Sequence, residues 1–225
     1  SFTGSGTVTF EKTLDNAENV AISGNAVFKD KVGETSGVAS ITVSGTSAIE
    51  GGSVKTSGNQ TYTGDVTFEA NTTLTAGSTA NWKNVGFGGK ASGSSYDLVI
   101  DGNALFGDSS GDTVNVKILS VSGTSDINGG IITTSGTQVY KGNVNLGLGT
   151  TLNAGSSGSF ENISFNGNIS GSGKSLTVNG NALFGDGTES DSVTLQSLTV
   201  NGETNIYSVS ITTSDSQNYK DNVTL

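Results

Sequence analysis

The sequence predicts an all-β fold, a parallel β-helix (solenoid) of about 11 coils with roughly 20 residues in each. Three observations favour this fold. A 78-residue unit recurs along the chain, apolar residues alternate over short runs, and Gly, Ser, Thr and Asn are abundant whereas Pro, Met and Cys are absent. This composition is typical of short strands and tight turns rather than of helices.

The repeat is clearest in a heptapeptide that returns at intervals of 78 residues. It reads ISGNAVF at 22–28, IDGNALF at 100–106 and VNGNALF at 178–184. Because the units of a solenoid stack on one another, the repeat predicts one continuous domain over residues 1–225. The copies are approximately 1–22 (partial), 22–99, 100–177 and 178–225 (partial), so we expect a segment of a longer array. About four coils are expected to fill each copy.

Within each copy, short strands are predicted wherever apolar residues occupy alternate positions. These pairs are Leu119 and Val121, Val144 and Leu146, Ile163 and Phe165, and Leu176 and Val178. Between the strands, Asn-Gly and Asp-Gly dipeptides supply residues that tolerate a positive φ where the chain turns. They begin at Asp101, Asn128, Asn166, Asn179, Asp186 and Asn201.

An antiparallel sandwich is the alternative fold, since Asn-Gly also marks hairpins. A parallel stack is favoured because apolar positions recur at spacings near 20 residues, as between Leu98 and Leu119 or Ile132 and Leu152. Aromatic residues also recur at one phase of the copies, so equivalent rings are expected to lie above one another in ladders. They are Phe28, Phe106 and Phe184, and Tyr62, Tyr140 and Tyr219. The absence of proline fits a stack in which strands donate hydrogen bonds to both neighbours.

The segments ITTSGTQVYKGNVNLGLGTTLNAG and ISFNGNISGSGKSLTVNGNALFGD resemble the repeats of filamentous-haemagglutinin-type exoproteins and related autotransporter adhesins of Gram-negative bacteria. The resemblance covers nearly the whole chain. It implies that the β-helix is right-handed and that the protein is secreted or displayed at the bacterial cell surface, associated with the outer membrane. It further implies a role in cell adhesion and virulence, and an outer-membrane transporter as the partner during secretion.

Charge and residue usage exclude several classes of function. The formal net charge of −10 disfavours binding to nucleic acid or to an anionic membrane surface. No apolar run approaches the roughly 20 residues that span a bilayer, so no membrane insertion is expected. Histidine and cysteine are absent, which removes the usual catalytic triads, disulfides and thiolate metal sites. We therefore expect no enzyme, no catalytic residue and no cofactor.

An acidic turn after each repeated phenylalanine is the main candidate for a metal site. Its carboxylates are Asp30 and Glu34 in the first copy, Asp108 and Asp112 in the second, and Asp186, Glu189 and Asp191 in the third. Such a cluster could collect Ca²⁺, which takes six to eight oxygen ligands. The turns match neither the EF-hand loop nor the calcium-binding nonapeptide repeat. A solvated acidic turn is thus the favoured interpretation, and no metal site is assigned.

Carboxylates also raise the alternative of a carbohydrate-active enzyme. Glycosidases need two carboxyl groups about 5 to 9.5 Å apart. Asp97 with Asp101, or Asp108 with Asp112, could supply such a pair. No copy carries a unique long insertion of the kind that usually builds an active site, so catalysis is the less favoured interpretation.

The aromatic residues are predicted to be structural. Tyr62, Tyr140 and Tyr219 are expected to face the interior, each capped by a hydrogen bond, with an exposed row that stacks on sugars as the alternative. Trp82 stands where Phe160 stands in the next copy and is predicted to belong to the core.

The function expected from these features is that of a non-enzymatic, rigid β-helical stalk in a large surface or secreted adhesin. In this role the parent protein, rather than the segment, contacts a receptor or glycan on a host or neighbouring cell. The alternative is that one face of the segment itself binds the receptor or glycan. Open strand edges at the two ends of the stack also make end-to-end self-association a possible outcome.

Overall fold

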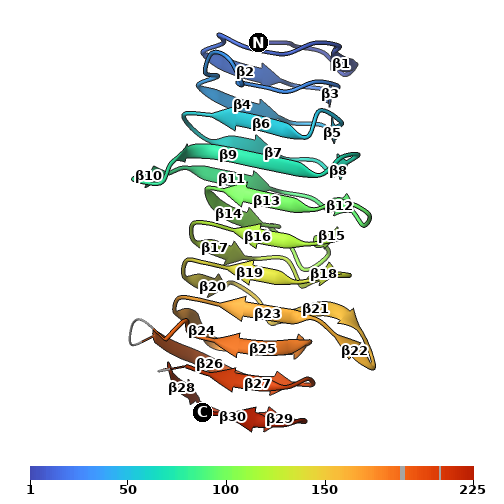
Figure 1. Cartoon of the computed structure of the whole chain (residues 1–225). Coiled ribbons are helices and arrows are strands. Elements are labelled where there is room, and N and C mark those ends of the chain that lie inside the picture. Colours follow the sequence, from blue (N-terminus) through green and yellow to red (C-terminus); the bar gives the residue numbers. More distant parts are fainter. Residues whose placement is uncertain (188–190, 208) are drawn as a thin grey trace.

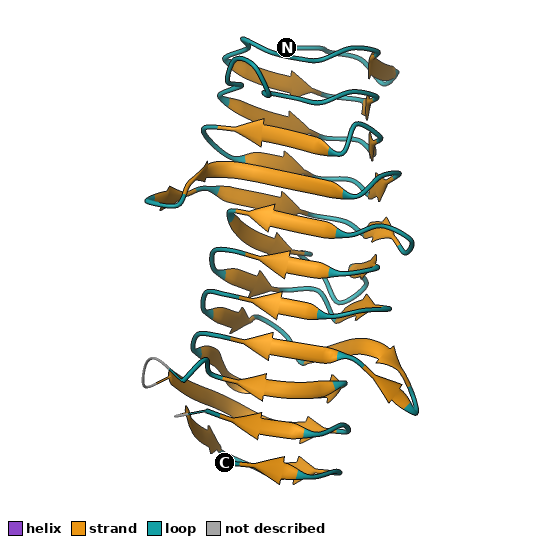
Figure 2. Cartoon of the chain, in the orientation of Figure 1, coloured by secondary structure: helices purple, strands orange, loops and turns teal. Residues whose placement is uncertain are grey.

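The computed structural model describes residues 1–187, 191–207 and 209–225. These residues form a right-handed parallel β-helix of about 11 turns with a spacing near 20 residues (Figure 1). All of its regular elements are strands (Figure 2), and the described part of the chain has no helix that could cross a membrane. At about 4.8 Å between neighbouring strands, the stack is roughly 50 Å long. The predicted fold class is therefore confirmed.

Each coil has three arms, and each arm pairs with its equivalents in the coils before and after it. The pairings form three parallel ladders, named ladders 1, 2 and 3 in the order in which the chain visits them. Isolated bridges at Phe2 in ladder 1, and at Leu14 and Val32 in ladder 3, serve as the first arms of their ladders.

Ladder 1 continues through β2 (Asn19–Ile22), β4 (Ser40–Val43), β7 (Gln60–Tyr62), β11 (Asn84–Phe87), β14 (Asn103–Phe106), β17 (Ser125–Ile127), β20 (Val144–Leu146), the first parts of β24 (Ile169–Asn179) and β26 (Asp191–Val200), and β28 (Val209–Thr213). Ladder 2 contains β1 (Thr7–Phe10), β3 (Asn25–Phe28), β5 (Ser47–Ile49), β8 (Val66–Phe68), β12 (Ala91–Gly93), β15 (Thr113–Val116), β18 (Ile131–Thr134), β21 (Thr150–Ser156), the second parts of β24 and β26, and β29 (Gln217–Tyr219). Ladder 3 continues through β6 (Ser53–Thr56), β9 (Thr72–Ser78), β13 (Leu98–Asp101), β16 (Leu119–Val121), β19 (Gln138–Tyr140), β23 (Asn162–Phe165), β25 (Asn181–Phe184), β27 (Thr204–Ile206) and β30 (Val223–Thr224).

Alternation along each arm explains why these residues form strands. In β14, Ala104 and Phe106 are buried whereas Asn103 and Leu105 are partly exposed. Successive side chains of a strand point to opposite faces, so one set lines the interior and the other meets solvent. The buried set forms one continuous apolar core along the stack.

Aromatic rings in this core stack from one coil to the next. Phe10 and Phe28 lie in ladder 2, with ring centroids 5.3 Å apart. In ladder 1 the column is Tyr62, Phe87 and Phe106, with centroids 5.8 and 5.9 Å apart. In ladder 3 it is Tyr140, Phe165 and Phe184, with centroids 5.5 and 5.4 Å apart. Parallel rings at these distances are in offset stacks, a favourable aromatic geometry.

The 78-residue repeat does not return to the same face of the rod. Phe28 lies in ladder 2, Phe106 in ladder 1 and Phe184 in ladder 3. From Phe28 to Phe106 the chain passes through eleven arms, namely Val32, β4, β5, β6, β7, β8, β9, β11, β12, β13 and β14. With three arms to a coil, each copy fills three and two-thirds coils. Each copy is thus one arm short of the predicted four coils. The prediction that equivalent rings share a ladder is wrong, because each ring stacks on a residue about one coil away.

Of the Asn-Gly and Asp-Gly corners, the predicted positive φ is confirmed at Gly187, at 81°, and is wrong at Gly102, Gly129, Gly167, Gly180 and Gly202. Among the described residues, the non-glycine with a positive φ is Asn16, at 56°. The glycines are needed for close approach instead. A Cβ on Gly123 would lie 2.6 Å from the carbonyl oxygen of Gly102, which accepts the backbone N–H of Gly123 at 2.9 Å. A neighbouring side chain completes the corner, since Asn103 Oδ1 accepts the N–H of Thr124 at 3.0 Å.

Candidate functional site

In the described part of the chain, two antiparallel hairpins project from the stack, one at the end of β9 and one at the end of β21 (Figure 1). β10 (Asn81–Trp82) folds back on β9, and β22 (Ser159–Phe160) folds back on β21. Each begins at a glycine with positive φ, 79° at Gly77 and 75° at Gly155. The hairpins occupy equivalent places in two copies but leave the stack from different ladders, because the repeat is rotated by one arm per copy.

These hairpins carry Trp82 and Phe160, so the prediction that Trp82 belongs to the core is wrong. Both side chains are half-buried, and both lie on the strand that returns from the hairpin tip. The sequence placed them in the core because they occupy the same phase of two copies. An equal phase shows only that two residues share an environment, and here that environment is a surface hairpin.

Below the second hairpin, three outward-facing asparagines form a column along ladder 2. Asn179 Nδ2 donates to Asn153 Oδ1 at 2.7 Å, and Asn201 Nδ2 donates to Asn179 Oδ1. The column starts at Thr133, whose hydroxyl accepts from Asn153 Nδ2 at 3.0 Å. Together with Phe160 and serines of the hairpin, these asparagines line a surface groove of about 570 Å³. Sequence reasoning missed this groove, although the one-coil spacing of the three asparagines was a usable signal.

The tyrosines face the interior, as predicted, each with the predicted hydrogen bond. Tyr62 and Tyr140 have no exposed surface, and their hydroxyls donate to Gln60 Oε1 at 3.1 Å and to Gln138 Oε1 at 2.9 Å. Tyr219 makes the same bond to Gln217 at 3.0 Å in the last coil, where it is less buried. Burial raises the pKa of Tyr62 and of Tyr140 far above the usual value.

Each buried glutamine also joins consecutive arms. Gln60 Nε2 donates to the carbonyl oxygens of Val54 and Thr75, at 3.0 and 2.9 Å, and lies 3.3 Å from Thr56 Oγ1. Gln138 makes the equivalent bonds to Asn153 O and Thr134 Oγ1. The motif Thr-Ser-Gly-x-Gln-x-Tyr is thus a buried clamp with a structural role, because its polar groups are bonded to one another and to backbone carbonyls.

In the second acidic turn, one carboxylate is used to stabilise the turn itself. Asp112 Oδ2 accepts the N–H of Asp108 at 3.1 Å, and the N–H and hydroxyl of Ser109, both at 2.9 Å. Burial raises the pKa of Asp112, but the hydrogen bonds from Asp108 and Ser109 outweigh it and lower the pKa overall. A carboxyl group held ionised in this way is a poor general acid.

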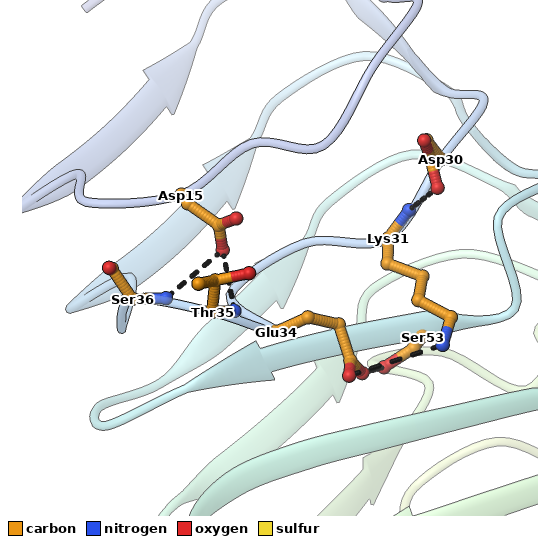
Figure 3. A network of polar contacts seen from close by, with 7 residues as sticks. All are labelled: Asp15, Asp30, Lys31, Glu34, Thr35, Ser36 and Ser53. Carbon is orange, nitrogen blue, oxygen red and sulfur yellow. Dashed lines mark hydrogen bonds and ion pairs between the residues drawn. The ribbon is translucent and has the colours of Figure 1, made fainter.

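The first acidic turn is organised differently (Figure 3). Asp30 accepts the N–H of Lys31 at 2.8 Å, whereas Glu34 accepts the hydroxyl of Ser53 at 2.7 Å and lies 4.0 Å from Lys31 Nζ. Asp15, from the preceding coil, accepts the backbone N–H groups of residues 35 and 36 at 3.2 and 3.4 Å. The carboxylates are therefore divided among separate contacts rather than gathered around one point.

In the third turn, Glu189 lies outside the described residues, and Asp191 is 7% exposed at the start of β26. Across the described residues, no group of three or more His, Cys, Asp or Glu side chains is arranged to hold a metal ion. Calcium binding at the pairs Asp108/Asp112 and Asp186/Asp191 is the less favoured alternative, and the interpretation of these segments as solvated acidic turns stays a prediction.

The carboxylates of the other proposed pair, Asp97 and Asp101, make separate contacts. Asp97 directly precedes β13 and Asp101 is its last residue, so about 13 Å of extended backbone separates their Cα atoms. Asp97 forms an ion pair with Lys117, at 3.7 Å, and Asp101 Oδ1 accepts the hydroxyl of Ser122 at 2.8 Å. The two carboxylates thus engage different partners in the next coil rather than meeting at one point.

In comparisons of the chain with protein-family models, with curated proteins and with solved structures, nothing matches. In the groove beside the second hairpin, an aromatic ring, hydroxyls and amides share a concave surface.

Proposed function

We propose that this chain is a rigid, non-enzymatic stalk segment of a large secreted or surface-displayed bacterial adhesin, which holds a receptor- or glycan-binding region away from the cell. Outer-membrane association and transport by an outer-membrane transporter are parts of the same proposal. They rest on the resemblance of the repeats to filamentous-haemagglutinin-type exoproteins.

The observation that carries the proposal is the continuity of the three ladders over the whole described stack. Each coil is bonded to the next on all three sides, and its apolar side chains join a single core. Bending such a rod would stretch hydrogen bonds on one side and compress packed side chains on the other. The arrangement suits a part whose task is to keep its two ends a fixed distance apart.

Stiffness can be measured with two spin labels on one ladder, because the chain has no native cysteine. Thr42 and Thr194 face outward in ladder 1, and the register places them in one column, seven coil steps apart. This corresponds to roughly 34 Å at about 4.8 Å per step. For a Thr42→Cys/Thr194→Cys variant, double electron–electron resonance should show one narrow distance distribution, and guanidinium should broaden it. A broad or bimodal native distribution would contradict the stalk.

Cell-surface display is tested separately. In the native host, a Thr42→Cys variant of the parent protein should react on intact cells with a membrane-impermeant maleimide, because this side chain is exposed on the rod. Labelling that appears only after the cells are lysed would refute display and leave the measured stiffness unaffected.

A further inference from the structure

We propose that the groove beside the β21–β22 hairpin binds an extended, uncharged, β-linked glycan whose chain runs parallel to the axis of the rod. Asn153, Asn179 and Asn201 would contact successive sugar units, and Phe160 would stack on one of them. This site goes beyond the stalk proposal, which holds whether or not the groove binds a ligand.

The hairpin itself is the first reason, because the stack does not need it. At the other end of the same coil, Leu146 of β20 reaches Thr150 of β21 with three intervening residues. From β21 to β23 the chain instead makes a separate antiparallel excursion through Phe160. Phe160 lines the groove and is partly exposed rather than part of the core. Ordering the hairpin costs conformational entropy, and the packing of the coil does not depend on the hairpin.

The asparagine column supplies hydrogen-bonding groups at the spacing of the coils. Each amide N–H₂ has two donors, and one of these is used in the bond to the preceding residue of the column. The second donor of each amide remains for a ligand. Successive amides lie about 4.8 Å apart, close to the length of one pyranose unit in an extended β-linked chain. A linear glycan along the axis therefore presents one sugar to each amide.

The charge of the groove and of the whole chain favours an uncharged glycan over an anionic one. The side chains that line the groove are uncharged, and the chain has a net charge of −10, which repels sulfated or uronic acid chains. An aromatic ring offers a flat apolar surface to the C–H face of a sugar, while amides and serine hydroxyls meet its hydroxyl groups.

An amide column alone would not support the proposal, since asparagine ladders also stabilise stacked strands without a ligand. Ladder 1 provides the comparison. There Asn145 Nδ2 donates to Asp126 Oδ1 at 2.7 Å, and Asn145 Oδ1 accepts the hydroxyl of Ser170 at 2.8 Å. This column has the same coil spacing but no hairpin, so Asn145→Ala is a matched control.

The test is calorimetric titration of the whole chain with cellohexaose and chitohexaose. Maltohexaose serves as the curved α-linked comparison and a heparin hexasaccharide as the anionic one. We expect saturable binding of at least one β-linked hexaose and none of the comparison sugars. Affinity should increase up to the trisaccharide and then level off, because three amides line the groove. Phe160→Ala and Asn179→Ala should each weaken binding by about tenfold, the loss of about 1.4 kcal/mol, whereas Asn145→Ala should not.

A measurement on the unaltered protein covers the case in which a variant fails to fold. On titration, the side-chain amide resonances of Asn153, Asn179 and Asn201 should shift in nuclear magnetic resonance spectra, and that of Asn145 should not. The proposal is overturned if neither β-linked hexaose binds, if a comparison sugar binds as tightly, or if the shifts or losses are equal in the Asn145 column.

Discussion

The buried clamp around Gln60 offers the sharpest test of how the coils are held in register. Gln60→Leu keeps a side chain of similar size but removes the amide. The change leaves three polar groups without this partner in the core: the hydroxyl of Tyr62 and the carbonyl oxygens of Val54 and Thr75. Gln60, Tyr62 and Val54 have no exposed surface, so water does not replace the lost bonds in the interior.

The magnitude follows from these three groups. At about 1 kcal/mol for each buried polar group that loses its bond, Gln60→Leu should reduce the free energy of unfolding by roughly 3 kcal/mol. For a chain of this size, about 1 kcal/mol lowers the melting midpoint by roughly 2 to 4 °C, so a decrease of roughly 6 to 12 °C is expected. Tyr62→Phe removes one of these bonds and should cost about 1 kcal/mol.

The assay is thermal and urea unfolding followed by circular dichroism, with Gln196→Leu as the control because Gln196 lies on the exposed face of β26. The control should change stability by no more than about 0.5 kcal/mol. In the double variant, Tyr62→Phe should be neutral or stabilising, since Gln60→Leu has already removed the partner of the hydroxyl. Equal effects of Gln60→Leu and Gln196→Leu, or strict additivity with Tyr62→Phe, would refute the role assigned to the clamp.

Two further predictions concern the corners and the buried tyrosines. Gly123→Ala should destabilise the protein by about 1–3 kcal/mol, because its Cβ would lie 2.6 Å from the Gly102 carbonyl oxygen. Gly37→Ala, which has open space around it, should have no such effect in the same unfolding assay. Because burial raises the pKa of Tyr62 and Tyr140, their contribution to stability should be complete below about pH 10 and should be lost as the pH rises further. Unfolding measured from pH 8 to 12 should show this loss, and a Tyr62→Phe/Tyr140→Phe variant should lose less.

The sequence predicted the fold because its strongest signals are local. Alternation such as that of Val144 and Leu146 requires only that one face of an arm be buried, and the structure places both side chains inside. The interior position and capping of Tyr62 were predictable for the same reason, since a large amphipathic ring needs both apolar packing and a partner for its hydroxyl.

The arrangement of the copies could not be predicted from the 78-residue period alone. The period gives a number of residues, whereas the side of the rod on which a residue lies depends on the number of arms that precede it. Because arms differ in length, the number of residues does not fix the number of arms. The step from Tyr62 to Phe87 is 25 residues because it contains the first hairpin, whereas the step from Phe87 to Phe106 is 19 residues. The candidate groove was missed for a related reason. The hairpin that carries Phe160 contains the same residue types, Gly, Ser and Asn, as the corners of the coils, so its sequence does not distinguish it from a corner.

The rotation of the repeat has a mechanical consequence. Because eleven is not a multiple of three, equivalent residues of successive copies lie in different ladders, in the order 2, 1, 3. Three copies contain 33 arms, or eleven coils, after which the same ladder is reached again. The large rings consequently occupy ladder 2, then ladder 1, then ladder 3, instead of thickening one side of the core along the whole rod. Bulky residues confined to one ladder would push that side of every coil outward and curve the stack, because the interior is close-packed. Duplication of a unit with eleven arms therefore lengthens the rod and distributes the large rings among the three sides of the stack. It also places the two hairpins on different sides.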